Sequence, residues 1–480
     1  MNLPISFLQG MREYFRKHKE LNEQDFLHSF DQTSKRGIRL NSRKVSKDSK
    51  EIIVDAFQLF EKIAWCENGY YTNTDGLGRN PYYHTGAFYI QEPSAMLPAE
   101  ILAPEPGDFV LDLCAAPGGK ATRLGEMLEG AGLLVANEIS KDRSRALLRN
   151  IELFGLENIV ITNENPQHLA MRFPKFFDKI VVDAPCSGEG MFRNDPQAVK
   201  SWEKYGPDVC VKMQEEILEY AAQMLKAGGD MVYSTCTFNP EENENQIDRF
   251  LNRHPEFMVI SHPDVRGTAT CNGANFFGAM RIWPQLSDGD GHFCVHLQKK
   301  KQTETEFQKD ISKRKKGIKG ETYSVRTAKE AFLNFCSDML TPDAYTKQKN
   351  KQGFLLFGDK LHILPIPVTK FDRLKVIKMG AFPGIIKHTE KDVLFIPSHS
   401  FALTLAPGKM KEEKCIILKD GDGRIWRYLS GETIFLTEDE QVQISKKGYI
   451  LIAFGDLPLG WGKRNGTTLK NEYPPAWRLR

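Results

Sequence analysis

The sequence lacks any apolar run close to the roughly 18 residues that a membrane-spanning helix needs, so we expect no membrane span. Its start, Met1-Asn2-Leu3-Pro4, has no basic flank followed by an apolar stretch, which is not the pattern of a targeting peptide. The nine cysteines show no paired metal-ligand spacing, which argues against a metal site or a disulfide framework and for free thiols in the cytoplasm. The net charge of +3 is too small to indicate nucleic-acid binding by itself.

What is present is an ordinary globular composition, with 41% hydrophobic and 26% charged residues in a chain of 480. Such a length suggests roughly three domains. From about residue 105 to 297, strand and helix signals alternate, which predicts a parallel, doubly wound α/β sheet. One of the expected helices runs from Gln214 to Leu225 and is followed by Gly228-Gly229, which we expect to separate it from the next strand.

Three of the expected strands end in segments that can carry chemistry. Residues 109–113 lead into a Gly-rich turn, residues 179–182 precede Asp183-Ala184-Pro185-Cys186, and residues 231–233 precede Ser234-Thr235-Cys236-Thr237. Ligands of open α/β sheets collect at the carboxyl ends of the strands. We therefore expect the turn and the two thiols to converge on one crevice.

The Gly-rich turn predicts a cofactor site. Gly118 and Gly119 allow close approach of backbone to a ligand, and the following helix would point its first amides at it. Neither a Walker phosphate loop nor the G-x-G-x-x-G dinucleotide fingerprint is present. Glu138, 26 residues after Asp112 at the end of the next expected strand, is placed to accept hydrogen bonds from a ribose. A nucleoside cofactor such as S-adenosylmethionine fits this pattern, although a Gly-Gly turn alone can be simple strand-to-helix punctuation.

The two thiols suggest group transfer through a covalent adduct. A thiolate that adds to carbon 6 of cytosine makes carbon 5 nucleophilic enough to accept a methyl group. Asp183 could supply a proton or hydrogen bond near ring nitrogen 3, and a second thiol or another base would help to release the product. The alternative, that Cys186 and Cys236 are small buried hydrophobes, is weakened by their Pro, Ser, Thr and Gly neighbours at strand ends.

With these segments, the sequence resembles the RNA cytosine-5 methyltransferase family (the Fmu/Sun/Nop group). The similarity is carried by residues 91–96, 111–120, 182–190, 233–244, 281–284 and 291–293. The resemblance implies that Cys236 is the nucleophile, that Cys186 assists release of the methylated RNA, and that Asp183 lies between cofactor and base. It also implies S-adenosylmethionine binding by Cys114, Ala115, Ala116, Pro117, Gly118, Gly119, Lys120, Glu138, Arg143, Asn165 and Asp183, with no metal.

Asn165 departs from the family pattern, which has an acid near the adenine at this position. An amide can still hydrogen-bond adenine, so we expect a weakened or altered contact there. Lys120 is expected to position Asp183 or the cofactor pocket rather than to act as a base.

The resemblance also sets the expected fold class and domains: a Rossmann-like S-adenosylmethionine-dependent core at 101–300, with an α+β RNA-binding region at 1–100 before it. A basic linker at 301–320, an intermediate domain at 321–395 and a β-rich PUA-like RNA-binding module at 396–480 complete the chain. Residues 299–320 hold nine Lys or Arg against three acids, which suits either a solvated linker or phosphate contacts.

The C-terminal third is similar to the extension of bacterial 16S ribosomal RNA cytosine-5 methyltransferases. This favours 16S ribosomal RNA or the small ribosomal subunit as substrate. We also expect a monomeric enzyme. Two alternatives remain: a tRNA cytosine-5 methyltransferase with the same core chemistry, and a ribosome-assembly factor in which catalysis is secondary.

Overall fold

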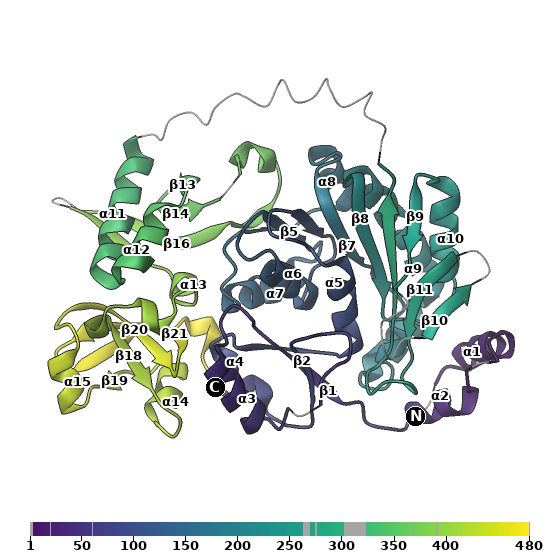
Figure 1. The fold of residues 1–480 in the computed structure, drawn as a ribbon, viewed down its shortest axis with the longest axis horizontal. Helices are drawn as coiled ribbons and strands as arrows, with labels where there is room; N and C mark the ends of the chain where they lie inside the picture. The colour runs from purple at the N-terminus through teal and green to yellow at the C-terminus, as the bar shows by residue number, and fades with distance from the viewer. Residues whose placement is uncertain are drawn as a thin grey trace.

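The computed structural model describes residues 3–19, 21–59, 61–262, 269–273, 276–301, 323–364, 366–389 and 392–479. Most of the predicted basic linker therefore lies outside the described residues. A ten-stranded sheet forms the centre, with N-terminal elements below it and the C-terminal third to the left in Figure 1. Within the described ranges, no helix is long and apolar enough to cross a membrane.

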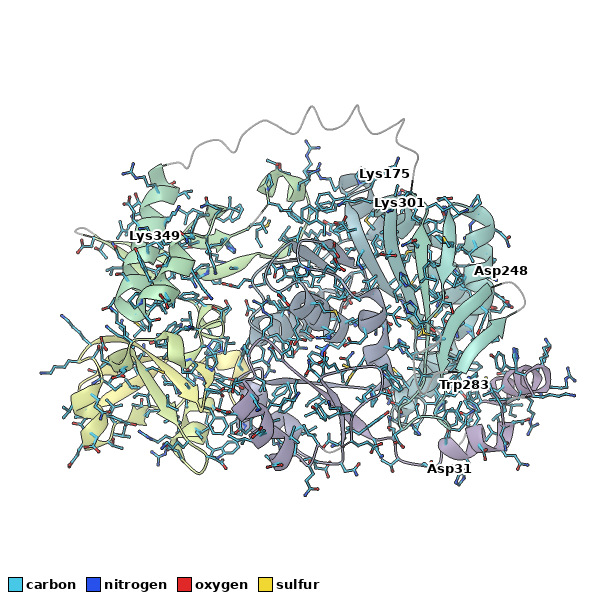
Figure 2. The ribbon with its side chains drawn as sticks, viewed as in Figure 1. Asp31, Lys175, Asp248, Trp283, Lys301 and Lys349 are labelled. Atoms are coloured by element: carbon cyan, nitrogen blue, oxygen red, sulfur yellow. The ribbon has the colours of Figure 1, made fainter. Side chains whose placement is uncertain are left out.

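The N-terminal region contains a small antiparallel sheet in the order β2-β1-β3, which packs on the core, and two helices that lie apart from it in Figure 1. The aromatic side chains of α1 and α2 pack around Trp283, which Figure 2 shows beside them. The elements are α1 (Ile5–Lys17), α2 (Glu23–Ser29), β1 (Arg36–Leu40), α3 (Lys47–Ala56), β2 (Gly69–Thr72), α4 (Pro81–His84) and β3 (Phe88–Gln91).

The core sheet runs in the order β10-β11-β12-β8-β7-β4-β5-β6-β15, with β9 paired to β12. Strands β4 to β8 are parallel, as the alternation predicts, whereas β12 and β15 are antiparallel to their neighbours β8 and β6. Its elements are α5 (Leu97–Leu102), β4 (Phe109–Asp112), α6 (Gly119–Met127), β5 (Leu133–Asn137), α7 (Lys141–Leu153), β6 (Ile159–Thr162), α8 (Pro166–Arg172), β7 (Phe177–Asp183), α9 (Pro196–Met224), β8 (Leu225–Thr235), α10 (Glu244–Arg253), β9 (Phe257–Ile260), β10 (Ala269–Gly273), β11 (Phe276–Ile282) and β12 (His292–Lys299).

Burial on both faces explains why these strands are short continuous apolar runs. Val110 and Leu111 of β4 are both fully buried, yet they belong to hydrophobic clusters on opposite faces of the sheet. This is typical of a parallel sheet covered by helices on both sides. The Rossmann-like α/β core expected from the sequence is confirmed.

The C-terminal third forms two further sheets, β13-β14-β16-β17 and β18-β20-β21-β22-β19. One strand of this region, β15, leaves these sheets and extends the core sheet beyond β6. The boundary expected after residue 395 falls inside β17. The elements are α11 (Tyr323–Met339), α12 (Pro342–Lys349), β13 (Phe354–Phe357), β14 (Lys360–Ile363), β15 (Val376–Met379), β16 (Ala381–His388), β17 (Val393–Pro397), α13 (His399–Ala402), β18 (Cys415–Leu418), α14 (Arg424–Leu429), β19 (Ile434–Phe435), α15 (Glu438–Gln443), β20 (Gly448–Phe454), β21 (Leu457–Asn465) and β22 (Thr468–Asn471).

Candidate active site

The crevice lies where the order of the parallel strands reverses. The chain passes from β4 through β5 to β6, and β7 then returns to the other side of β4. The carboxyl ends of β4, β7 and β8 are therefore adjacent, which is the usual ligand site of such sheets. The structure brings the Gly-rich turn and both thiols to this edge, as expected from the sequence.

The turn after β4 requires its glycines. Gly118 has φ +117°, a conformation that L side chains rarely adopt, and it caps the first turn of α6. A Cβ atom on Gly119 would lie 2.9 Å from the side-chain nitrogen of Gln91. The backbone therefore passes close to Gln91 and leaves the space above the helix start open to a ligand.

The two thiols face each other. The sulfur atoms of Cys186 and Cys236 lie 3.3 Å apart, at the ends of β7 and β8. Glu242 holds the loop of Cys186 by accepting hydrogen bonds from the amide and hydroxyl of Ser187 and from the amide of Gln214. The hydrogen bond to Cys236, together with burial, raises the pKa of the Cys186 thiol well above its usual value.

A second set of contacts fixes the turn that carries Cys236. The hydroxyl of Thr235 donates to Asn243, and the amide of Asn243 in turn donates to the carbonyl of Thr237. All three residues are buried. The side chain of Asn243 thus spans the turn and sets the position of the sulfur between its two threonines.

Asp183 is held as a carboxylate beside the thiols. One oxygen lies 2.8 Å from Lys120 Nζ; the other accepts from the Ser234 hydroxyl at 2.8 Å and lies 3.5 Å from His292 Nε2. Burial alone would raise the pKa of Asp183, but Lys120 and His292 hold it well below its usual range. The sequence analysis left open whether Asp183 supplies a proton or a hydrogen bond. Its ion pair with Lys120 favours the hydrogen bond, because an ionised carboxylate has no proton to give.

A cavity of 330 Å³ joins the turn to Cys236. It is lined by Tyr89, Ile90, Gln91, Glu92, Ala95, Asp112, Cys114, Ala115, Ala116, Pro117, Gly119, Lys120, Asp183, Gly190, Met191, Cys236, Asp290, Gly291 and His292. Of the predicted site residues, most of the turn, Asp183 and Cys236 face this space, and Cys186 touches it through its contact with Cys236.

The cavity fits a cofactor that carries an amino group. Both carboxylate oxygens of Asp112 and the side-chain oxygen of Gln91 are buried without a hydrogen-bond partner among the described residues. Burial and the nearby charge of Asp183 raise the pKa of Asp112 to about 8. A ligand ammonium placed here would satisfy these oxygens and favour the ionised form of Asp112. The amino acid end of S-adenosylmethionine has such a group.

Besides Gly118, three predicted cofactor residues do not line the cavity. Glu138 is buried, accepts from the Ser140 amide and lies 3.6 Å from Arg143. Arg143 donates to the carbonyl of Ala116, so it supports the turn from outside. Asn165 is exposed and caps α8 by accepting from the Gln167 amide. Their contacts with a cofactor stay predictions.

Five residues of the site were not predicted from the sequence: Asp112, Gln91, His292, Glu242 and Asn243. All except Asp112 lie in the quoted similar segments outside the turn, and Asp112 lies in the segment that leads into it. Their spacing alone gave no sign that they converge. Only the strand order and the loop contacts show which of them reach the cavity and which support the thiols.

The fold and this cavity define an S-adenosylmethionine-dependent methyltransferase. The sequence profile of 16S rRNA methyltransferase RsmB/F matches residues 99–298; profiles of the RsmF N-terminal domain and the RsmF PUA domain match residues 3–93 and 417–479. The chain is 30% identical to "Ribosomal RNA small subunit methyltransferase F" of Shewanella piezotolerans, over 98% of this chain and 96% of that protein. The chain therefore belongs to the 16S rRNA methyltransferase RsmB/F family.

Other relatives agree with this assignment. The protein of the same name from Vibrio vulnificus is 29% identical over 98% of this chain and 97% of its own. Among solved structures, a methyltransferase homologue from Pyrococcus horikoshii aligns with a TM-score of 0.51 and 27% identity, covering 62% of this chain and all of that one. These matches confirm the predicted core and the predicted C-terminal PUA module.

Proposed function

We propose that this protein methylates carbon 5 of cytosine in 16S ribosomal RNA through a covalent Cys236–cytosine adduct. The observation that carries the proposal is the pair of thiols 3.3 Å apart, of which Cys236 lines a cavity that extends to the cofactor turn. Bound S-adenosylmethionine would supply an electrophilic methyl group at this site. Asp112 and the turn around Gly119 would hold it.

The chain's own residues then prepare the base. The Cys236 sulfur, as a thiolate, forms a bond with carbon 6 of cytosine. The carbon 5–carbon 6 double bond breaks, and its electron pair makes carbon 5 electron-rich. Asp183 accepts a hydrogen bond from the exocyclic amino group, while Lys120 stays beside it as a cation and offsets the negative charge that develops on the ring. The target base must be unpaired or flipped out of its stack to reach these groups.

Cys186 acts later, when the product leaves. Its raised pKa keeps it protonated near neutral pH, next to the Cys236 sulfur. A thiol in this position can donate a hydrogen bond to that sulfur as the sulfur–carbon bond breaks. Glu242 positions Cys186 for this step through the Ser187 loop.

The substrate follows from the relatives and from the C-terminal module. Full-length relatives are named as acting on small-subunit ribosomal RNA, and the PUA-type sheet supplies a second site for RNA. A tRNA target would use the same core chemistry. We place the enzyme in the cytoplasm and expect it to act as a monomer.

Methyl transfer to RNA tests the chemistry. Wild-type protein should transfer tritiated methyl groups to small ribosomal subunits from cells that lack it, and Cys236→Ala should lower this rate by at least about 10³-fold. Cys186→Ala should accumulate a protein–RNA adduct visible as a gel shift, whereas Cys236→Ala should form none. Cys415→Ala, a free cysteine of β18, is the matched control. No transfer by wild type to ribosomal RNA or tRNA would exclude the enzymatic proposal and leave an RNA-binding factor.

Bisulfite mapping tests the substrate. RNA from cells with and without the protein should differ at one or more cytosines of 16S ribosomal RNA. A difference confined to tRNA would instead establish the alternative target. Comparing assembled subunits with naked 16S RNA in the transfer assay then shows which form is recognised.

A further inference from the structure

His292 occupies a position beside the reacting thiol. It opens β12, whose next residue Phe293 pairs with Thr235 of β8, so the antiparallel register sets His292 beside Cys236. His292 is 4% exposed and lines the cavity, and its Nε2 atom is buried without a well-formed hydrogen bond among the described residues. An oxygen of the Asp183 carboxylate lies 3.5 Å from this nitrogen.

The proposed reaction leaves one role without a residue. After methylation, carbon 5 carries both the new methyl group and its original proton, and a base must remove that proton. The base has to line the cavity, and it has to be free to accept a proton there. Each titratable group of the cavity can be judged by these conditions.

Most of these groups cannot accept a proton. Without a ligand, burial and Asp183 raise the pKa of Asp112 to about 8, and with cofactor bound its carboxylate would be engaged by the ligand ammonium, so it is not a free base in either state. Asp183 is held as a low-pKa anion by Lys120 and is a weak base. Burial raises the pKa of Cys114, which is thus a neutral thiol.

The two acids at the rim are engaged elsewhere. Glu92 accepts hydrogen bonds from the backbone amides of Ser94 and Asp290, as well as from the Ser94 hydroxyl. Asp290 is paired with Arg193 and accepts from the Asn194 amide. Both carboxylates hold loops together, so neither is available as a base.

We propose that His292 is the base that removes the carbon 5 proton, a role that rests on the proposed cytosine-5 methylation. The proton moves from carbon 5 to an imidazole nitrogen of His292. The electron pair of the carbon–hydrogen bond is first held in the ring as an enamine, between carbons 4 and 5. It then forms the carbon 5–carbon 6 double bond as the carbon 6–sulfur bond breaks and the pair of that bond returns to Cys236. Asp183 then faces an imidazolium cation and stabilises it. Imidazole suits this task because its ordinary pKa lies near the working pH.

Two labels test this assignment. Small ribosomal subunits from cells that lack the protein, with tritium at carbon 5 of their pyrimidines, are incubated with S-adenosylmethionine labelled with ¹⁴C in its methyl group. Wild type should release one tritium for each methyl group transferred. His292→Gln should still form the Cys236 adduct and transfer its methyl group, but tritium release should slow by about 10²-fold or more. His296→Gln, four residues along the same strand and paired with Asp230 and His262, is the matched control.

The trapped adducts separate His292 from Cys186. The adduct of His292→Gln should retain both labels, whereas that of Cys186→Ala should carry ¹⁴C and have lost its tritium. Added imidazole should restore tritium release to His292→Ala, because the substitution leaves room for it in the cavity. Release by His292→Gln within about threefold of wild type, or loss of adduct, methyl transfer and tritium release together without rescue, would overturn the assignment. If wild type itself neither transfers the ¹⁴C methyl group nor releases tritium, the proposed function fails and not only the role of His292.

Discussion

The catalytic cavity and the junction between the three parts of the chain both contain buried polar groups that have no hydrogen-bond partner in the part of the chain that the structure describes. In the cavity these are the oxygens of Asp112 and Gln91; at the junction they are both ring nitrogens of His399 and one of His84. The cavity groups face open space, whereas the junction rings are packed by aromatic side chains. His399 lies edge-on to the rings of Tyr473 and Trp477 at centroid distances of 5.1 and 4.9 Å.

The junction joins sequence segments that are far apart. His84 of α4 lies 3.1 Å from the hydroxyl of Tyr473, and Arg149 of α7 stacks over Trp477. Lys44 donates to the carbonyls of residues 85 and 153. Figure 1 shows the C terminus beside α3 and α4, consistent with these contacts. A buried unpartnered group therefore indicates a ligand site only where it also meets a cavity; elsewhere it marks a cost of packing domains together.

Between these two regions, the larger expected effect is on the cavity side, at Asp183. Asp183→Asn removes the anion that pairs with Lys120 and faces the base, so methyl transfer should fall by about 10²- to 10³-fold. The substitution also leaves Lys120 buried and unpaired, which should lower the free energy of unfolding by about 3 kcal/mol or more. Methyl transfer and thermal unfolding are measured on the same samples. Asp178→Asn, at the other end of β7 with a partly exposed partner in Lys226, is the control.

Loss of stability without loss of rate would contradict this prediction. The double substitution Lys120→Met and Asp183→Leu replaces the ion pair with two apolar side chains. It should recover the free energy of unfolding but not the rate of methyl transfer. That double substitution separates the electrostatic role of the pair from its packing. Recovery of activity as well would show that neither charge takes part in the reaction.

The thiol wall of the cavity was more predictable from sequence than the cofactor wall. Cys186 and Cys236 follow apolar runs directly, and the convergence of parallel strands places their sulfurs together. Glu138 and Asn165 also follow strands, but their side chains are taken up by local contacts that the pattern does not reveal. Likewise Gly228 and Gly229, expected to separate helix from strand, lie inside β8, because that strand begins directly at the end of α9.

Long-range placement explains the remaining differences. Residues 376–379 carry no signal that they join a sheet formed some two hundred residues earlier, yet they pair with β6. The contact of Tyr473 with His84 spans most of the chain. His292 illustrates the same limit at the site itself. It belongs to residues 291–293, one of the segments that carry the family resemblance. Its position beside Cys236, however, depends on the register of two antiparallel strands.

The junction should respond to acid, and this is the next largest effect. Burial lowers the pKa of His399 to about 3, with a further contribution from Lys44, and burial together with Arg149 lowers that of His84 to about 4. In the unfolded chain both histidine rings take up a proton below their ordinary pKa near 6.5, whereas in the folded chain they stay neutral until a much lower pH. Stability is therefore present above pH 6.5 and is lost as the pH falls towards 4. Each ring should lower the free energy of unfolding at pH 5 by roughly 2 kcal/mol relative to pH 7.

Thermal unfolding at pH 7 and pH 5 measures this loss. His399→Leu should reduce the acid-induced drop in Tm, because the variant has no imidazole to protonate at the junction. His388→Leu, an exposed position on β16, is the matched control and should leave the drop unchanged. Equal drops in wild type and His399→Leu would show that the junction does not resist protonation.

The smallest expected effect tests the cofactor wall at Asn165. Aspartate caps a helix about as well as asparagine, so Asn165→Asp should change the free energy of unfolding by less than about 0.5 kcal/mol, and Asn165→Ala should lower it by about 1 kcal/mol. Because the side chain is exposed and engaged in its cap, we expect both variants to keep the KM for S-adenosylmethionine within about threefold of wild type, a difference of less than about 0.7 kcal/mol. A marked fall in this KM for Asn165→Asp alone would instead show that position 165 reaches the adenine, as the family resemblance implies. Comparing the two variants therefore separates a residue that only caps α8 from one that also recognises the cofactor.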